Sequence, residues 1–313
     1  MDRPESSLAS PRFCGVPTFM RLPYTTDLTG IHAAVTGLPF DTGSPYRVGC
    51  RFGPNALRAI SVMLRPINPY RGFDVFETLK VVDYGDSPIV PGETARSFDA
   101  MEAHLAPILA AGAVPIGIGG DHSITFPELK AVAAAHGPVS LLLFDAHPDC
   151  WGNYLGIEHH AGTWARRAAE QGLVDPATSL IVGLRGSLFE WADHGAAHEL
   201  GYEVLTMDRM YDMGLLAVAA HINARLAGRK TFLSFDIDIL DPAFAPGIQT
   251  PEAGGMTSRE ALGLLRALKG MNIVGADVVE CNPSFDHAQI TALIGATVLA
   301  EILALIAEGR RAA

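Results

Sequence analysis

The 313-residue sequence has few cysteines, few charged residues and a deficit of positive charge. Its four cysteines, at positions 14, 50, 150 and 281, show no CxxC spacing, which argues against a disulfide framework and a thiolate metal site. Lysine and arginine number 23 against 34 acidic residues, a net charge of −11, so a phosphate backbone would be repelled. We therefore expect a reduced protein that binds no nucleic acid.

Long apolar segments are also scarce. The first residues contain no apolar leader, which favours a cytoplasmic location. One stretch, Gln289–Ala307, approaches the length of a membrane span, but it contains Gly295 and Glu301, and no other span precedes it. We expect this stretch to form a buried C-terminal helix, and we expect no membrane partner.

Hydrophobic residues make up 49% of the chain, enough for one large core across residues 1–313. Residues 1–27, rich in Pro, Ser and Thr, are expected to form an irregular arm that adds nothing to the core and contacts a neighbouring subunit. The rest alternates short apolar runs with helical patterns. Expected strands are Ile31–Leu38, Lys80–Tyr84, Ala113–Ile118, Val139–Phe144, Ser179–Leu184, Glu203–Thr206, Thr231–Phe235 and Asn272–Val279. Expected helices are Asn55–Leu64, Ser97–Ala110, Ile124–Ala135, Thr163–Gln171, Met213–Leu226 and Ser258–Leu268. This order predicts an α/β fold with a mostly parallel eight-stranded sheet wrapped by helices.

Carboxylates and imidazoles directly follow three of the expected strands. The runs are Gly119-Gly120-Asp121-His122-Ser123, Asp145-Ala146-His147-Pro148-Asp149 and Asp236-Ile237-Asp238-Ile239-Leu240-Asp241. Because chemistry in parallel sheets gathers beyond the carboxyl ends of the strands, we expect these side chains to converge. Six candidate metal ligands result: His122, Asp145, His147, Asp149, Asp236 and Asp238.

Four carboxylates and two histidines form a hard, oxygen-rich donor set that suits Mn²⁺ or a similar divalent ion. Converging carboxylates would repel one another by several kcal/mol at an effective dielectric constant of about 20, and two divalent cations would neutralise them. Two ions bridged by a carboxylate and a water would lower the pKa of that water and supply a hydroxide. The sequence therefore predicts a dinuclear hydrolase.

Two other interpretations of these runs are weaker. The glycines of 117–120 lack the spacing of a dinucleotide-binding turn, and Asp121 would face the phosphate. The run at 236–241 lacks the glycine and the final glutamate of a calcium loop.

At these residues the sequence resembles the ureohydrolase family of arginases, agmatinases and guanidino-acid hydrolases. The likeness spans nearly the whole chain and includes Thr18–Pro23, Gly37–Gly43, Arg51–Pro54, the three ligand runs and Asp277–Pro283. The early segments resemble the agmatinase and guanidino-acid branch most. The resemblance implies a three-layer α/β/α sandwich and a trimeric or hexameric homo-oligomer.

The resemblance also implies residue roles. One cation would be held by His122, Asp145, Asp149 and Asp236, and the other by Asp145, His147, Asp236 and Asp238, so that Asp145 and Asp236 bridge. Glu280 matches the acid that receives the substrate guanidinium, and its alternative is a salt bridge to an arginine. Asp149 matches the carboxylate that orients the hydroxide and takes its proton. Asp121 and Asp241 are expected to hold ligands through hydrogen bonds.

Two loops depart from the family pattern. The proton-shuttling histidine of a His-Gly-Thr-like run falls on Ala161, one residue after His160, so either the loop shifts to let His160 serve or the enzyme works without that shuttle. A common Gly-Thr-Gly-Thr run is Gly247-Ile248-Gln249-Thr250 here, which places Gln249 and Thr250 as candidate substrate contacts.

We therefore expect an amidinohydrolase acting on agmatine, 4-guanidinobutyrate or 3-guanidinopropionate, with Mn²⁺ as the default ion. The altered loops leave open guanidine, guanylurea or an N-alkylated biguanide as substrate, with Ni²⁺ in place of Mn²⁺. A metal-dependent deacylase is disfavoured because all six ligands are present. A subunit of a hetero-oligomer, catalytic only with its partner, is a further alternative.

Overall fold

A computed structural model describes residues 3–190 and 192–312. Its centre is an eight-stranded sheet in the order β4-β1-β5-β10-β9-β6-β7-β8, and every pairing in it is parallel. The strands are β1 (Ala33–Leu38), β4 (Val81–Asp86), β5 (Val114–Gly119), β6 (Ser140–Phe144), β7 (Leu180–Leu184), β8 (Glu203–Thr206), β9 (Lys230–Asp236) and β10 (Asn272–Val279). The predicted α/β class and all eight predicted strands are confirmed.

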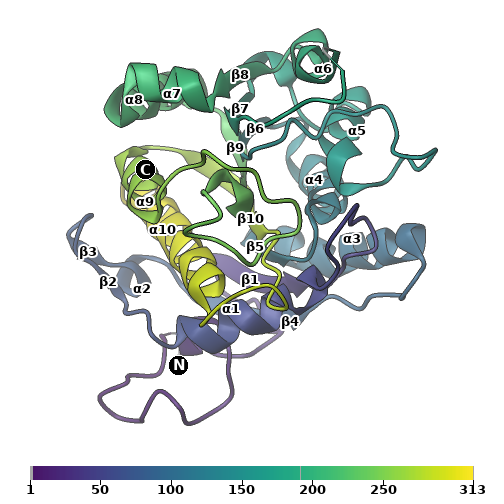
Figure 1. Ribbon diagram of the computed structural model, residues 1–313. Coiled ribbons are helices and arrows are strands. Elements are labelled where there is room, and N and C mark those ends of the chain that lie inside the picture. Colours follow the sequence, from purple (N-terminus) through teal and green to yellow (C-terminus); the bar gives the residue numbers. More distant parts are fainter. Residues whose placement is uncertain (1–2, 191, 313) are drawn as a thin grey trace.

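Helices cover both faces of this sheet, so the molecule has three layers (Figure 1). One layer contains α3 (Thr94–Ala110), α4 (Thr125–His136), α5 (Trp164–Glu170) and α6 (Ala192–Leu200). The other contains α1 (Gly53–Ser61), α2 (Val75–Thr78), α7 (Met207–Met213), α8 (Leu215–Leu226), α9 (Ser258–Ala267) and α10 (Ile290–Ala312).

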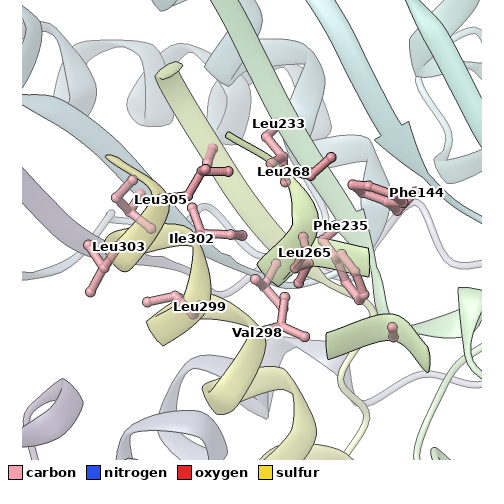
Figure 2. Packing of buried hydrophobic residues seen from close by; sticks show 14 of the residues in the cluster. Phe144, Leu233, Phe235, Leu265, Leu268, Val298, Leu299, Ile302, Leu303 and Leu305 are labelled. Carbon is pink, nitrogen blue, oxygen red and sulfur yellow. The ribbon is translucent and has the colours of Figure 1, made fainter. Parts of the chain in front are cut away.

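The core lies on both faces because the central strands are buried on both sides. Successive side chains of a strand point to opposite faces, so Leu233 and Phe235 of β9 join the cluster under α9 and α10, whereas Phe232 joins the cluster under α4. Figure 2 shows Leu233 and Phe235 beside Leu265 and Val298 of the covering helices. Parallel strands covered on both faces read as continuous apolar runs, which is why the sequence predicted them well.

Helix α10 is long and apolar enough to cross a membrane, yet 78% of its apolar window is buried inside the protein. Its one acidic residue in that stretch, Glu301, is 5% exposed and accepts hydrogen bonds from Arg266 (2.7 Å) and Asn68 (2.8 Å). The prediction of a buried C-terminal helix is confirmed, and the neighbouring arginine explains how its carboxylate is tolerated.

The N-terminal arm differs from expectation. It was predicted to add nothing to the core, but Phe19, Met20 and Leu22 are buried in the cluster under α10. They lie in and beside a 3-10 turn, Phe19–Arg21, which is anchored by a hydrogen bond from the Phe19 amide to Asp83 (2.8 Å). Three apolar residues in such a short turn produce no periodic pattern, so their burial could not be predicted from the sequence.

Two element predictions were incomplete. The predicted helix Met213–Leu226 is observed as α8 only, because Gly214, with a φ of 79°, separates it from α7, which was not predicted. Helix α6 and the short antiparallel pair β2 (Ile67–Asn68) and β3 (Phe73–Asp74) were not predicted. These elements have weak apolar patterns and lie away from the ligand-bearing strands.

Candidate active site

The six predicted ligands lie in turns at the carboxyl ends of three central strands. His122 begins a 3-10 turn after β5, three ligands follow β6, Asp236 ends β9, and Asp238 lies in the 3-10 turn Ile237–Ile239. Backbone amides fix these carboxylates: Asp145 accepts from the His147 amide (2.6 Å), and Asp236 accepts from the Asp238 amide (2.7 Å). Each turn therefore orients its own ligands before any cation binds.

The ligand atoms form two adjoining groups that share Asp145. In the first, Nδ1 of His122 lies 3.0 Å from Asp145 Oδ2, 3.2 Å from Asp149 Oδ2 and 3.0 Å from Asp236 Oδ2. In the second, Nδ1 of His147 lies 2.8 Å from Asp238 Oδ2 and 3.5 Å from Asp145 Oδ1. The two oxygens of Asp145 thus serve different groups, as a bridging ligand requires.

The donor set fits two divalent cations. His122 Nδ1, Asp145 Oδ2 and Asp238 Oδ2 are buried and have no hydrogen-bond partner among the described residues. Buried polar atoms without partners are costly, and three of them within two adjoining ligand groups indicate that cations belong there. Carboxylate and imidazole donors without thiolates are the chemistry that Mn²⁺ and similar ions prefer.

Electrostatics lead to the same conclusion. Burial, with repulsion from Asp145, raises the pKa of Asp149 to about 8, and burial with repulsion from Asp238 raises the pKa of Asp236 well above its ordinary value. Burial also opposes ionisation of Asp145, yet the neighbouring imidazoles of His122 and His147 lower its pKa. So many carboxylates ionise together only when additional positive charge accompanies them.

A hydrogen-bonded chain behind His122 fixes its orientation. Ser234 donates to Asp277 Oδ1 (2.7 Å), so the Ser234 oxygen accepts from Nε2 of His122 (2.8 Å). Thr125 donates to the other oxygen of Asp277 (2.6 Å). The proton of neutral His122 therefore lies on Nε2, and the lone pair of Nδ1 points toward the carboxylates.

The sequence did not predict the roles of Ser234 and Asp277, although Ser234 precedes Asp236 by two residues on the same strand. The residues expected in that role, Asp121 and Asp241, hold loops instead. Asp121 accepts from the amides of Gly43 (2.7 Å) and Ser123 (2.9 Å), and Asp241 from those of Ala243 and Gly254. Neither makes a hydrogen bond to a candidate ligand.

A pocket of about 510 Å³, including its open mouth, lies over the ligands. Its walls include the predicted substrate contacts His160, Gln249, Thr250 and Glu280. Glu280 directly follows β10 and has a φ of 70°, and Asp149 has a φ of 49°. Such left-handed backbone at a non-glycine residue costs roughly 1–3 kcal/mol and is typical of functional sites.

Glu280 already has partners from this chain on both oxygens. Oε1 accepts from the His122 amide (2.7 Å) and from Nε2 of Gln249 (2.8 Å), and Oε2 accepts from the same Nε2 (2.9 Å) and from the thiol of Cys50 (3.4 Å). No arginine in the described chain forms the alternative salt bridge. The sequence identified both residues but not this contact, which depends on how two loops pack.

Comparison with known proteins identifies the family. The model of the arginase family matches residues 31–305. The chain belongs to the arginase family. It is 40% identical to guanidinopropionase from Pseudomonas aeruginosa, covering 98% of this chain and 96% of the relative. It is 41% identical to agmatinase from Chromobacterium violaceum, covering 94% and 89%.

Solved structures agree with this membership. A hypothetical agmatinase from Burkholderia thailandensis has 41% identity and a TM-score of 0.89, covering 96% of this chain and 94% of that one. Proclavaminate amidinohydrolase from Streptomyces clavuligerus has 39% identity and a TM-score of 0.91, covering 96% and 100%. The predicted family and the three-layer sandwich are confirmed, and this arginase-family chain is an amidinohydrolase with clustered ligands for a dinuclear site.

In this arginase-family chain, His160 does reach the pocket although it is one residue off the family position. Its ring stacks on Tyr154 with centroids 4.3 Å apart, and its Nδ1 accepts from the Gly162 amide (3.0 Å). Burial lowers the pKa of His160 to about 4, so the ring is neutral near pH 7. With Nδ1 accepting, the proton lies on Nε2, which has no partner among the described residues. His160 therefore lines the pocket as a neutral residue, and its buried Nε2–H is a donor without a partner among the described residues.

Proposed function

We propose that this arginase-family enzyme hydrolyses a small guanidino compound to urea and an amine by means of two divalent cations, Mn²⁺ by default. One cation would be held by His122, Asp145, Asp149 and Asp236, and the other by Asp145, His147, Asp236 and Asp238. The observation that supports this proposal most is Asp145, whose two oxygens lie in two ligand groups beneath one pocket.

Two bound cations would neutralise the carboxylates and lower the pKa of water to near neutrality. Within the chain, Asp149 is the residue suited to handle the proton. Its Oδ2 accepts from the indole of Trp164 (2.6 Å), which fixes the carboxylate, and no hydrogen bond among the described residues engages Oδ1. Water adds to the guanidine carbon, the bond from this carbon to the leaving nitrogen breaks, and Asp149 Oδ1 carries the proton that this nitrogen gains.

The relatives' names support three default substrates: agmatine, 4-guanidinobutyrate and 3-guanidinopropionate. The altered loops at His160 and Gln249 support the alternative of guanidine, guanylurea or a biguanide, with Ni²⁺ in place of Mn²⁺. A second subunit is a further alternative, in which this chain requires a partner for turnover. The six converging ligands favour none of these over the others.

The test is urea release from these guanidino compounds by protein reconstituted separately with Mn²⁺ and with Ni²⁺. We expect urea from at least one compound with at least one ion, and none after chelation. Asp145→Ala should abolish turnover because it removes a ligand from both groups. Loaded protein that releases no urea alone, but does so with a partner chain, would replace the single-chain proposal with the hetero-oligomeric one.

A further inference from the structure

A second cleft opens beside the candidate active site. Its volume is about 1310 Å³, including its open mouth. Three residues, His147, Trp151 and Thr250, line both this outer cleft and the pocket above the ligands, so the two spaces are continuous. A guanidino substrate whose guanidine lies over the ligands would therefore extend its other end into the outer cleft.

Four rings in contact lead from the inner pocket to the outer cleft: His160, Tyr154, Trp151 and Phe189. Tyr154 stacks on His160 with centroids 4.3 Å apart and lies nearly parallel to Trp151, at 5.8 Å and 14°. Trp151 in turn contacts Phe189, with centroids 5.7 Å apart. Trp151 and Tyr154 are half-buried and Phe189 is 86% exposed, so this aromatic row has ring surface open to the outer cleft.

Trp151 is fixed at the centre of the aromatic row. Its indole donates to Asp193 (3.2 Å), and its backbone amide donates to the Gly162 carbonyl (3.0 Å). A Cβ atom at position 162 would lie 2.8 Å from ring carbon Cε3 of Trp151, so glycine is the residue that leaves room for the ring there. Trp151 is thus held in place before a substrate binds, which lowers the entropic cost of binding.

The charges of the outer cleft favour a cation. Two carboxylates line it: Asp193 accepts hydrogen bonds only from neutral N–H groups, and the side chain of Glu252 has no hydrogen bond or ion pair within the described chain. The one lysine or arginine among the described lining residues, Arg185, donates to backbone carbonyls, including those of Asp238 (2.6 Å) and Glu252 (2.8 Å). A carboxylate in this cleft would therefore meet two acids and a guanidinium that is already engaged.

We propose that the aromatic row and Glu252 bind a cation at the far end of the guanidino substrate. The face of an aromatic ring attracts a cation through its quadrupole, most strongly in tryptophan, and Glu252 supplies the opposite charge. The substrate class that follows is an alkylguanidine with an amine at its other end, as in agmatine, and not a guanidino acid. This inference rests on the proposed function and leaves its ligands and reaction unchanged.

The experiment measures kcat and KM of metal-loaded protein with four guanidines of similar length that differ at the far end. Agmatine carries an ammonium there, its N-trimethyl analogue a quaternary ammonium, pentylguanidine a methyl group and 4-guanidinobutyrate a carboxylate. Wild type should show a kcat/KM at least about 10-fold higher for agmatine than for 4-guanidinobutyrate, with pentylguanidine between them. The trimethyl analogue should lie within about 3-fold of agmatine, because attraction to a ring face needs no N–H group.

Variants separate the ring from the charge. Trp151→Leu should lower kcat/KM about 10-fold for agmatine but no more than about 2-fold for pentylguanidine, whereas Trp151→Phe should keep most of the preference. Glu252→Gln should raise the KM for agmatine about 3-fold and lower that for 4-guanidinobutyrate. Glu93→Gln removes the same charge at an exposed position just before α3 and is the control, which should change neither value.

Bound metal is measured in every variant, because Trp151 lies two residues from Asp149. If Trp151→Leu binds less metal, Phe189→Leu and Glu252→Gln, which lie on other segments, still test the inference. Wild-type preference for 4-guanidinobutyrate, or an equal loss for agmatine and pentylguanidine in the loaded ring variants, would overturn the inference and leave the amidinohydrolase intact. Absence of urea from every compound would overturn the proposed function itself. Calorimetric binding of butyltrimethylammonium would then decide the inference: weaker binding to Trp151→Leu than to wild type supports it, and equal binding overturns it.

Discussion

At the scale of single residues, the site depends on tautomers and lone pairs as much as on residue types. His160 is neutral because burial lowers its pKa to about 4, and His122 must be neutral to bind a cation through Nδ1, but hydrogen bonds place the two ring protons differently. The Ser234–Asp277 pair leaves a lone pair on the inward nitrogen of His122, whereas the Gly162 amide leaves a proton on the inward nitrogen of His160. The first histidine is thereby suited to bind a cation and the second to donate a hydrogen bond.

Ser234 should therefore affect cation binding through His122. Ser234→Ala removes the acceptor for His122 Nε2–H and frees the imidazole to turn, so affinity for the first cation should fall roughly 10-fold to 100-fold. Titration of the apoprotein with Mn²⁺, with bound metal measured directly, checks this value. Ser140 is also buried but lies at the end of β6 away from the candidate ligands, so Ser140→Ala is the control and should bind Mn²⁺ as tightly as wild type does. Equal affinities in the two variants would mean that Ser234 does not orient the ligand.

The six candidate ligands could be predicted from the sequence because they lie at or just after the carboxyl ends of expected strands. Those ends meet at one edge of a parallel sheet. Ser234 and Asp277 were not assigned because they lie inside strands, and polar residues there have many structural explanations. The contact of Gln249 with Glu280 joins residues 31 positions apart through loop packing. No short-range pattern encodes such a contact.

At the scale of elements, prediction followed the strength of the apolar pattern. Most of the sheet strands and α10 have clear apolar runs and were recognised, whereas α2, α6 and the β2–β3 pair have short or weak ones and were not. The N-terminal arm shows where this kind of prediction fails, because its buried residues are too few and too close together to produce a periodic pattern. It is irregular in conformation but contributes to the core through Phe19, Met20 and Leu22.

The arm should therefore be required for stability. Phe19→Ala removes a fully buried ring that packs under α10, and we expect the free energy of unfolding to fall by about 3–5 kcal/mol. Phe189→Ala, which removes an 86% exposed ring, should change it by no more than about 0.5 kcal/mol. Denaturant unfolding of metal-free protein measures both. A Phe19→Ala variant as stable as wild type would mean that the arm does not contribute to the stability of the core.

At the scale of the whole molecule, part of the arm remains uncovered. Three large apolar side chains of one short segment are exposed: Leu8 by 101%, Phe13 by 91% and Val16 by 77%. Exposed apolar side chains that lie together are typical of surfaces that bind another protein. We predict that a neighbouring subunit covers them in a trimer or hexamer. Light scattering should give a particle of three or six 33.3 kDa chains. A particle with the mass of one chain would exclude this assembly.

The proposed function requires that the two ligand groups sharing Asp145 form one catalytic centre. The most direct measurement is stepwise titration of the apoprotein with Mn²⁺ or Ni²⁺, following bound ions per chain and urea release from its best guanidino substrate together. We expect urea release to reach its maximum only as the second ion binds, and Asp145→Ala to show neither full metal binding nor turnover. Full urea release by the metal-free protein, or with a single ion per chain, would contradict it.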